Sequence, residues 1–210
     1  MMTPLRPRDG IGALRRFVRA EPVEACEFCN IPIPAEHRHL VEPATRKILC
    51  ACLVCCEAVA GRLDRTYRLV PRDGSRLWDF RMTDAQWHAL GLPIEMAFLF
   101  HSTPAGRPIA LYPGPVGAAE SPIEAGAWSA LVADNPSLGE LEPDVEALLI
   151  NRLMGRRAYY RVPIDRCFAL VGLIRTRWRG WTGGDEVWDA IDGFFGTLAE
   201  AAGPALGGAR

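Results

Sequence analysis

Hydrophobic residues recur along the chain with two periods, and each period predicts one kind of element. Helical spacing in residues 187–198 predicts a helix that ends before Gly203-Pro204. Its apolar positions are Val187, Trp188, Ile191, Phe194, Phe195 and Leu198. Residues 165–177 predict a buried helix, and residues 10–20 predict a short amphipathic helix. Strand composition marks residues 67–71, 94–100, 108–112 and 158–162. Residues 145–152 fit either a strand or a helix, and a strand is favoured.

Polar residues next to these segments supply helix start signals. Thr83 and Gln86 have the spacing of a capping box, so a short helix is expected to begin there. Ser121 is expected to be the N-cap of another helix, with Pro122 in its first turn, and that helix should stop before Asn135-Pro136. Strands and helices do not alternate as regular βαβ units, so the predicted fold class is α+β.

The 210 residues predict four consecutive parts. Residues 1–20 hold the amphipathic helix, and residues 21–64 form a small cysteine-rich, metal-binding module that resembles a treble clef or zinc ribbon. Residues 65–202 form the larger mixed α+β domain. Residues 203–210 are expected to be a flexible tail.

Composition and charge narrow the class of protein. The net charge is −1, which disfavours a nucleic-acid partner, and no segment has the roughly 20 apolar residues that span a bilayer. Six of the seven cysteines lie in residues 26–56, whereas a disulfide framework would spread them, so a reduced cytoplasm with a metal site is expected. Residues 120–146 hold seven acids and no base, and residues 152–179 hold eight arginines, so these blocks are expected to pair.

Two pairs of cysteines carry the chemistry. Cys26 and Cys29 are separated by two residues, and so are Cys52 and Cys55. This spacing lets one tight turn aim two thiolates at one point, and two such turns supply the four soft ligands of a tetrahedral Zn²⁺. A hairpin is expected between the pairs, and a helix over residues 52–63, which gives the knuckle, hairpin and helix order of a treble clef.

Other groups in the segment leave the ligand set open. Cys50, His37 or His39 could replace one of the four cysteines. A second ion is disfavoured because these remaining groups lack a second paired spacing. Cys56 is expected to pack its helix and Cys167 to lie in the core, since a free cysteine behaves as a small hydrophobe.

The donor set predicts a structural rather than catalytic metal. Four thiolates leave no open coordination position, and the chain has no phosphate-binding loop or hydrolase motif, so a non-enzymatic protein is expected. Iron in a rubredoxin-like electron carrier is one alternative, although such knuckles place glycine where Asn30 and Cys56 stand. A treble-clef regulator that binds nucleic acid is the other alternative, and the near-neutral charge disfavours it.

Several motifs together resemble an uncharacterised bacterial family encoded beside nickel-iron hydrogenases. The resemblance covers about residues 20–200 and rests on Cys26-x-x-Cys29, His37-Arg-His39-Leu, Leu49-Cys50-Ala-Cys52-x-x-Cys55, Pro163-Ile-Asp165, Leu170-Val-Gly172-x-Ile-Arg175 and Trp178-x-Gly180. It implies a zinc-binding accessory protein that supports the assembly or function of a nickel-iron hydrogenase. The partner it implies is a hydrogenase subunit or maturation factor.

Overall fold

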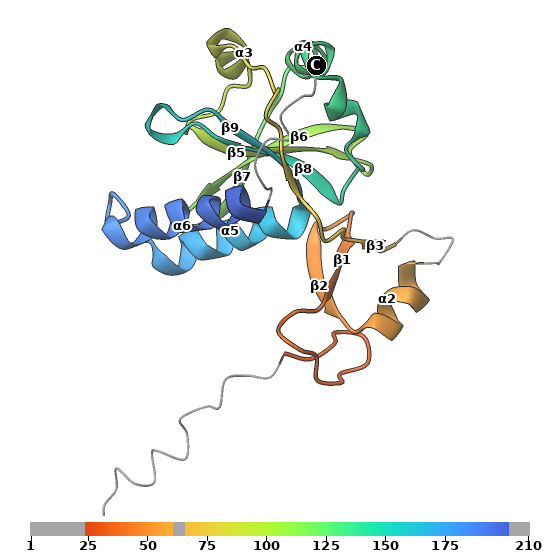
Figure 1. Cartoon of the computed structure of the whole chain (residues 1–210). Helices are drawn as coiled ribbons and strands as arrows, with labels where there is room; N and C mark the ends of the chain where they lie inside the picture. The colour runs from red at the N-terminus through yellow and green to blue at the C-terminus, as the bar shows by residue number, and fades with distance from the viewer. Residues whose placement is uncertain (1–23, 61–65, 202–210) are drawn as a thin grey trace, which may run out of the picture.

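The computed structural model describes residues 24–60 and 66–201, which form two sheets with helices packed around them (Figure 1). The cysteine-rich segment contributes a three-stranded sheet and one helix. The rest of the described chain contributes a six-stranded antiparallel sheet with helices on both faces. The predicted α+β class is confirmed.

The six-stranded sheet has the order β4-β9-β8-β5-β6-β7, and all its pairs are antiparallel. Its strands are β4 (Ser75–Arg76), β5 (Met96–Ser102), β6 (Arg107–Gly114), β7 (Gly117–Ser121), β8 (Glu146–Asn151) and β9 (Ala158–Pro163). The strands predicted for β5, β6, β8 and β9 are confirmed to within a few residues. The short edge strands β4 and β7 had no hydrophobic signal that could have predicted them.

Helices cover both faces of this sheet. One face packs against α5 (Ile164–Arg177) and α6 (Asp185–Ala201), and the other packs against α3 (Asp84–Ala89) and α4 (Ala125–Asp134). Two short 3-10 turns, η2 (Pro136–Glu140) and η3 (Leu153–Gly155), complete the description. The predicted helices at residues 165–177 and 187–198 are therefore confirmed as α5 and α6.

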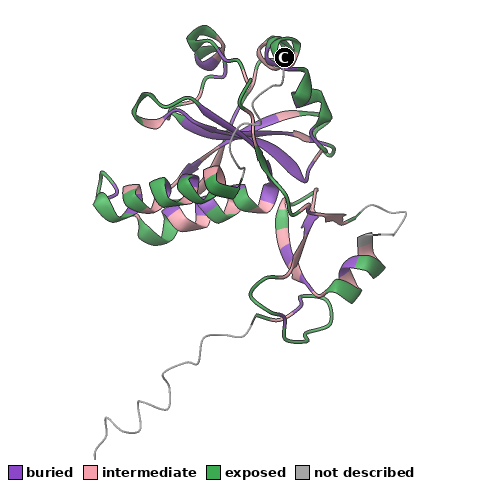
Figure 2. Cartoon of the chain, in the orientation of Figure 1, coloured by how far each residue is buried: buried purple, intermediate pink, exposed green. Residues whose placement is uncertain are grey.

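Burial on both faces explains the composition of the central strands. In β5, Phe98 and Phe100 belong to the core beside α5 and α6, while Ala97 and Leu99 belong to the core beneath α3 and α4. Every residue of β8 is buried (Figure 2). An antiparallel strand normally alternates apolar and polar positions because one face meets water, and covering both faces removes that alternation.

The two predicted helix starts have different outcomes. Thr83 caps α3, and the capping box with Gln86 is present in both directions. The prediction for Ser121 is wrong: α4 has Glu124 as its N-cap, and Ser121 is the last residue of β7. Its hydroxyl donates to the carbonyl of Gly91 at 3.2 Å, so a tertiary contact takes the side chain that the local pattern assigned to the cap.

The small sheet joins the larger one through shared core residues. Strand β1 (Arg38–Glu42) pairs with β2 (Lys47–Ala51) and with β3 (Arg68–Leu69), and α2 (Leu53–Ala60) follows β2. Val41 and Val70 are buried in the same core as α5 and α6. The small sheet therefore extends past residue 64, and it packs against the larger domain rather than hanging from a linker.

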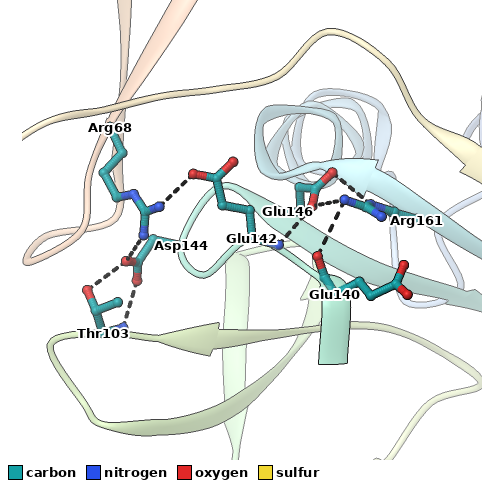
Figure 3. A network of polar contacts seen from close by, with 7 residues as sticks. All are labelled: Arg68, Thr103, Glu140, Glu142, Asp144, Glu146 and Arg161. Atoms are coloured by element: carbon teal, nitrogen blue, oxygen red, sulfur yellow. Dashed lines mark hydrogen bonds and ion pairs between the residues drawn. The ribbon is translucent and has the colours of Figure 1, made fainter. Parts of the chain in front are cut away.

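The acidic block is held mainly by arginines from outside the block predicted to pair with it. Arg161 contacts Glu146 at 2.6 Å, and among the ion pairs of the described chain this is the one that joins the two blocks. Arg68, from the small sheet, contacts Glu142 at 2.6 Å and Asp144 at 3.3 Å (Figure 3). The predicted pairing is thus confirmed for one pair, and the other contacts fasten the small sheet to the larger domain.

Two predictions lie outside the described residues, namely the amphipathic helix at residues 10–20 and the flexible tail at residues 203–210. Within residues 24–60 and 66–201, none of the helices combines the length and apolar character needed to cross a bilayer.

Candidate metal centre

The first knuckle is a tight turn that places two sulfurs on one side. The backbone N–H of Asn30 donates to the carbonyl of Cys26 at 2.8 Å, and that of Cys26 donates to the carbonyl of Ile31 at 2.9 Å. Asn30 adopts φ 59°, a left-handed conformation that asparagine tolerates better than most residues. Asn30 thus adopts the conformation expected of a glycine at this position. The absence of glycine is therefore no longer an argument against iron at this knuckle.

The hairpin and helix bring in the second pair. Strand β2 ends at Ala51, Cys52 follows it directly, and Cys55 lies in the first turn of α2. The N–H of Cys55 points at the sulfur of Cys52 at 3.4 Å. Two residues separate these sulfurs, so one helical turn aims both at the same point. The predicted order of knuckle, hairpin and helix is present.

Four sulfurs converge where these turns meet. The Sγ atoms of Cys26, Cys29, Cys52 and Cys55 all lie within 4.8 Å of one another. Those of Cys29 and Cys52 are 3.8 Å apart. A tetrahedral ion with Zn–S bonds of about 2.3 Å separates its sulfurs by about 3.8 Å. The cluster therefore fits a tetrahedral thiolate-bound ion with little rearrangement.

The pKa values of the Cys26 and Cys55 thiols are shifted in opposite directions. Burial alone would raise the pKa of Cys26, but backbone N–H groups of Cys52, Cys29 and Phe28 donate to its sulfur and lower the pKa to about 6. Hydrogen bonds with Cys29 and Cys52 raise the pKa of Cys55. Hydrogen bonds thus favour the thiolate of Cys26, while Cys55 keeps its proton. A metal cation that bound the cluster would displace the proton of Cys55.

Glu27 holds the two halves of the site together, and no sequence motif pointed to it. Its carboxylate accepts the backbone N–H of Cys50 at 3.0 Å and the Nζ of Lys47 at 2.7 Å. Its own N–H donates to the carbonyl of Cys50 at 2.9 Å. These bonds tie the first knuckle to β2. Burial alone would raise the pKa of Glu27, but the two hydrogen bonds that its carboxylate accepts lower the pKa.

The groups named as possible substitutes lie together, apart from the four sulfurs. A ring nitrogen of His37, a ring nitrogen of His39 and the sulfur of Cys50 lie within 4.8 Å of one another, as a group separate from the cluster above. Cys56 is 2% exposed and packs in the small core under the hairpin. Cys167 is fully buried in the main core, so both packing predictions are confirmed.

Comparison with protein families matches residues 25–202 to one family model, described as a family of unknown function (DUF5947). The match includes the four clustered cysteines and both sheets. No curated protein and no solved structure matches the chain.

Proposed function

Since the chain belongs to this family of unknown function (DUF5947), we propose from its own geometry that it is a non-enzymatic zinc-binding protein that docks on a protein partner. The observation that carries the proposal is the convergence of four cysteine sulfurs on one point. Zinc suits four thiolates in a tetrahedron and has no redox chemistry of its own, so its role here is structural.

The small core of the module supports a structural role for the ion. Its fully buried cluster contains six residues, and two of these are cysteines: Cys26, Ile33, Leu40, Leu49, Ala51 and Cys56. So few apolar side chains cannot by themselves order a knuckle, a hairpin and a helix, and small domains of this kind depend on a metal or on disulfides. The ion would thus order a surface rather than activate a substrate.

That surface carries exposed apolar side chains next to the ligands. Phe28 and Ile31 flank Cys29, and Leu53 and Val54 stand between the second pair of cysteines. These four side chains are among the large hydrophobic residues that the described chain leaves exposed. Apolar side chains grouped around one site favour a protein partner. The resemblance to a family encoded beside hydrogenases suggests that the partner is a nickel-iron hydrogenase subunit or a maturation factor, and that the protein acts in the cytoplasm.

Elemental analysis of protein purified without added metal tests the ion. We expect colourless protein that holds zinc and no stoichiometric iron. Red protein that dithionite bleaches reversibly would instead show an iron centre at the four sulfurs, and the structural role would have to be given up in favour of electron transfer.

Affinity purification from cells that express a nickel-iron hydrogenase tests the partner. Wild-type protein should recover a hydrogenase subunit or maturation factor, and Val54→Ser should recover several-fold less. Val116→Ser is the matched control, since it makes the same change at an exposed valine between β6 and β7, far along the chain from the cysteines. Recovery of no hydrogenase-related protein, or equal loss in both variants, would overturn the accessory role.

A further inference from the structure

A second group of metal-binding side chains lies on the hairpin. His39 in β1 is paired directly with Cys50 in β2. Residues directly opposite each other on neighbouring strands project from the same face of a sheet, and so do residues two apart on one strand. His37 lies just before β1, and its ring packs edge-on against the ring of His39, with the centroids 4.7 Å apart. This explains why their donor atoms lie within 4.8 Å of one another.

Hydrogen bonds engage the same nitrogen in each histidine. Nδ1 of His39 contacts the Asp165 carboxylate at 2.7 Å, and Nδ1 of His37 contacts the carbonyl of Pro34 at 2.9 Å. Because a carboxylate and a carbonyl can only accept, each Nδ1 carries the proton and each Nε2 is left with a free lone pair. Metal-binding histidines are held in this way, with the second nitrogen bonded to a carboxylate or carbonyl.

The free nitrogen of His37 has no partner within the described chain. Its side chain is 5% exposed, and Nε2 is buried without a hydrogen bond. A buried acceptor that has lost its hydrogen bond to water destabilises the fold, so such atoms call for an explanation. A cation at this point would supply the missing interaction.

We propose that His37, His39 and Cys50 form a second metal site, separate from the four-cysteine cluster. Two imidazole nitrogens and one thiolate suit a borderline divalent ion of the zinc class. A tetrahedral ion would hold these donors about 3.3–3.6 Å apart, which side-chain adjustment can reach. The paired spacing that the sequence lacks is supplied across the hairpin, where His39 faces Cys50.

Three protein donors leave one coordination position free. Both histidines line a cavity of about 320 Å³, together with Asp165 and the arginines Arg38, Arg72 and Arg166. Water or a small anion from this cavity can complete the tetrahedron. The second site therefore differs from the first in chemistry, since the four-cysteine cluster has no position for an outside ligand.

Asp165 couples the second site to the larger domain. It lies in the first turn of α5, 126 residues after His39. Its carboxylate holds the tautomer of His39 and would raise the basicity of the coordinating nitrogen. Asp165 is thus a positioning residue. Through it, α5 orients the His39 ring that would bind the second ion.

Zinc stoichiometry of the full chain tests the proposal. After equilibrium dialysis against buffered free Zn²⁺, wild-type protein should hold two ions per chain. His39→Ala and Cys50→Ala should each hold one, while His88→Ala, a histidine on α3, should hold two. Cys29→Ser should weaken binding of the other ion and leave the affinity of the second unchanged, which separates failure of this site from failure of the four-cysteine site.

One ion per chain in saturated wild-type protein would overturn the second site, and so would two ions in Cys50→Ala. Asp165→Asn keeps all three donors and should weaken only the second ion by about 10–100-fold. Asp192→Asn is its matched control, because that exposed carboxylate pairs with Arg156 away from the cavity. Equal affinities in the two aspartate variants would remove the positioning role.

Discussion

Replacing Cys29 by serine separates metal binding from packing more cleanly than any other ligand change. Cys29 is exposed and belongs to none of the buried clusters, whereas Cys26 is 1% exposed and forms part of the small core. Serine keeps the size of the side chain and removes the thiolate. The effect of Cys29→Ser should therefore come almost entirely from the lost metal bond.

The size of that effect follows from the number of ligands. Structural zinc binds with about 10–16 kcal/mol in small domains, so each of four equivalent thiolates accounts for about 2.5–4 kcal/mol. Since 1.4 kcal/mol corresponds to tenfold, the zinc affinity of the four-cysteine cluster should fall roughly 60- to 700-fold. The neighbouring sulfur of Cys52, 3.8 Å away, is itself one of the four proposed ligands and cannot compensate.

Competition with a chromophoric zinc chelator measures this affinity, and far-UV circular dichroism of the chelated protein follows the loss of α2 and the hairpin. Cys56→Ser is the matched control, because its sulfur is 2% exposed and belongs to neither metal-binding group. It should keep wild-type zinc affinity while lowering stability. Wild-type affinity in Cys29→Ser, or the large loss in Cys56→Ser, would refute the ligand assignment.

Three further predictions concern capping, the contact between the sheets, and proton release. Thr83→Ala removes the capping box of α3 and should lower the free energy of unfolding by about 1 kcal/mol in urea denaturation. Arg68→Ala leaves the 3% exposed carboxylate of Asp144 without its cation and should lower the free energy of unfolding by about 1.5–3 kcal/mol in the same measurement. An unchanged free energy of unfolding would show that the hydrogen bonds from Thr103 are enough to hold the buried carboxylate. Zinc binding at pH 7 should release protons from Cys29 and Cys55, because their raised pKa values keep them as thiols, so zinc affinity should fall as the pH falls. Calorimetry in buffers of different ionisation enthalpy counts the released protons. Zinc binding without proton release would contradict the ligand assignment.

Both candidate metal sites are encoded in the sequence, but they are not equally visible in it. Each half of the first site depends on residues three apart, so the spacing of Cys26 with Cys29 and of Cys52 with Cys55 is visible in the sequence. The meeting of the two halves is a tertiary contact, held by the hydrogen bonds between Glu27 and Cys50. The second depends on which residue of β2 lies opposite His39. A shift of one position in the register would turn Cys50 to the other face of the hairpin. Cys50 therefore meets the two histidines only in the observed register, which pairs it with His39.

Elements with local signals could be predicted from the order of residues alone. These are the paired cysteines, the hairpin, the capping box at Thr83, and the amphipathic helix α6. Tertiary structure decided which faces are covered and which distant groups meet. It buried β8 on both sides, used the Ser121 hydroxyl in a bond to Gly91, and brought Asp165 to His39 across 126 residues. Local spacing is fixed by backbone geometry, whereas such long-range contacts depend on the packing of the whole core, which no short window of residues contains.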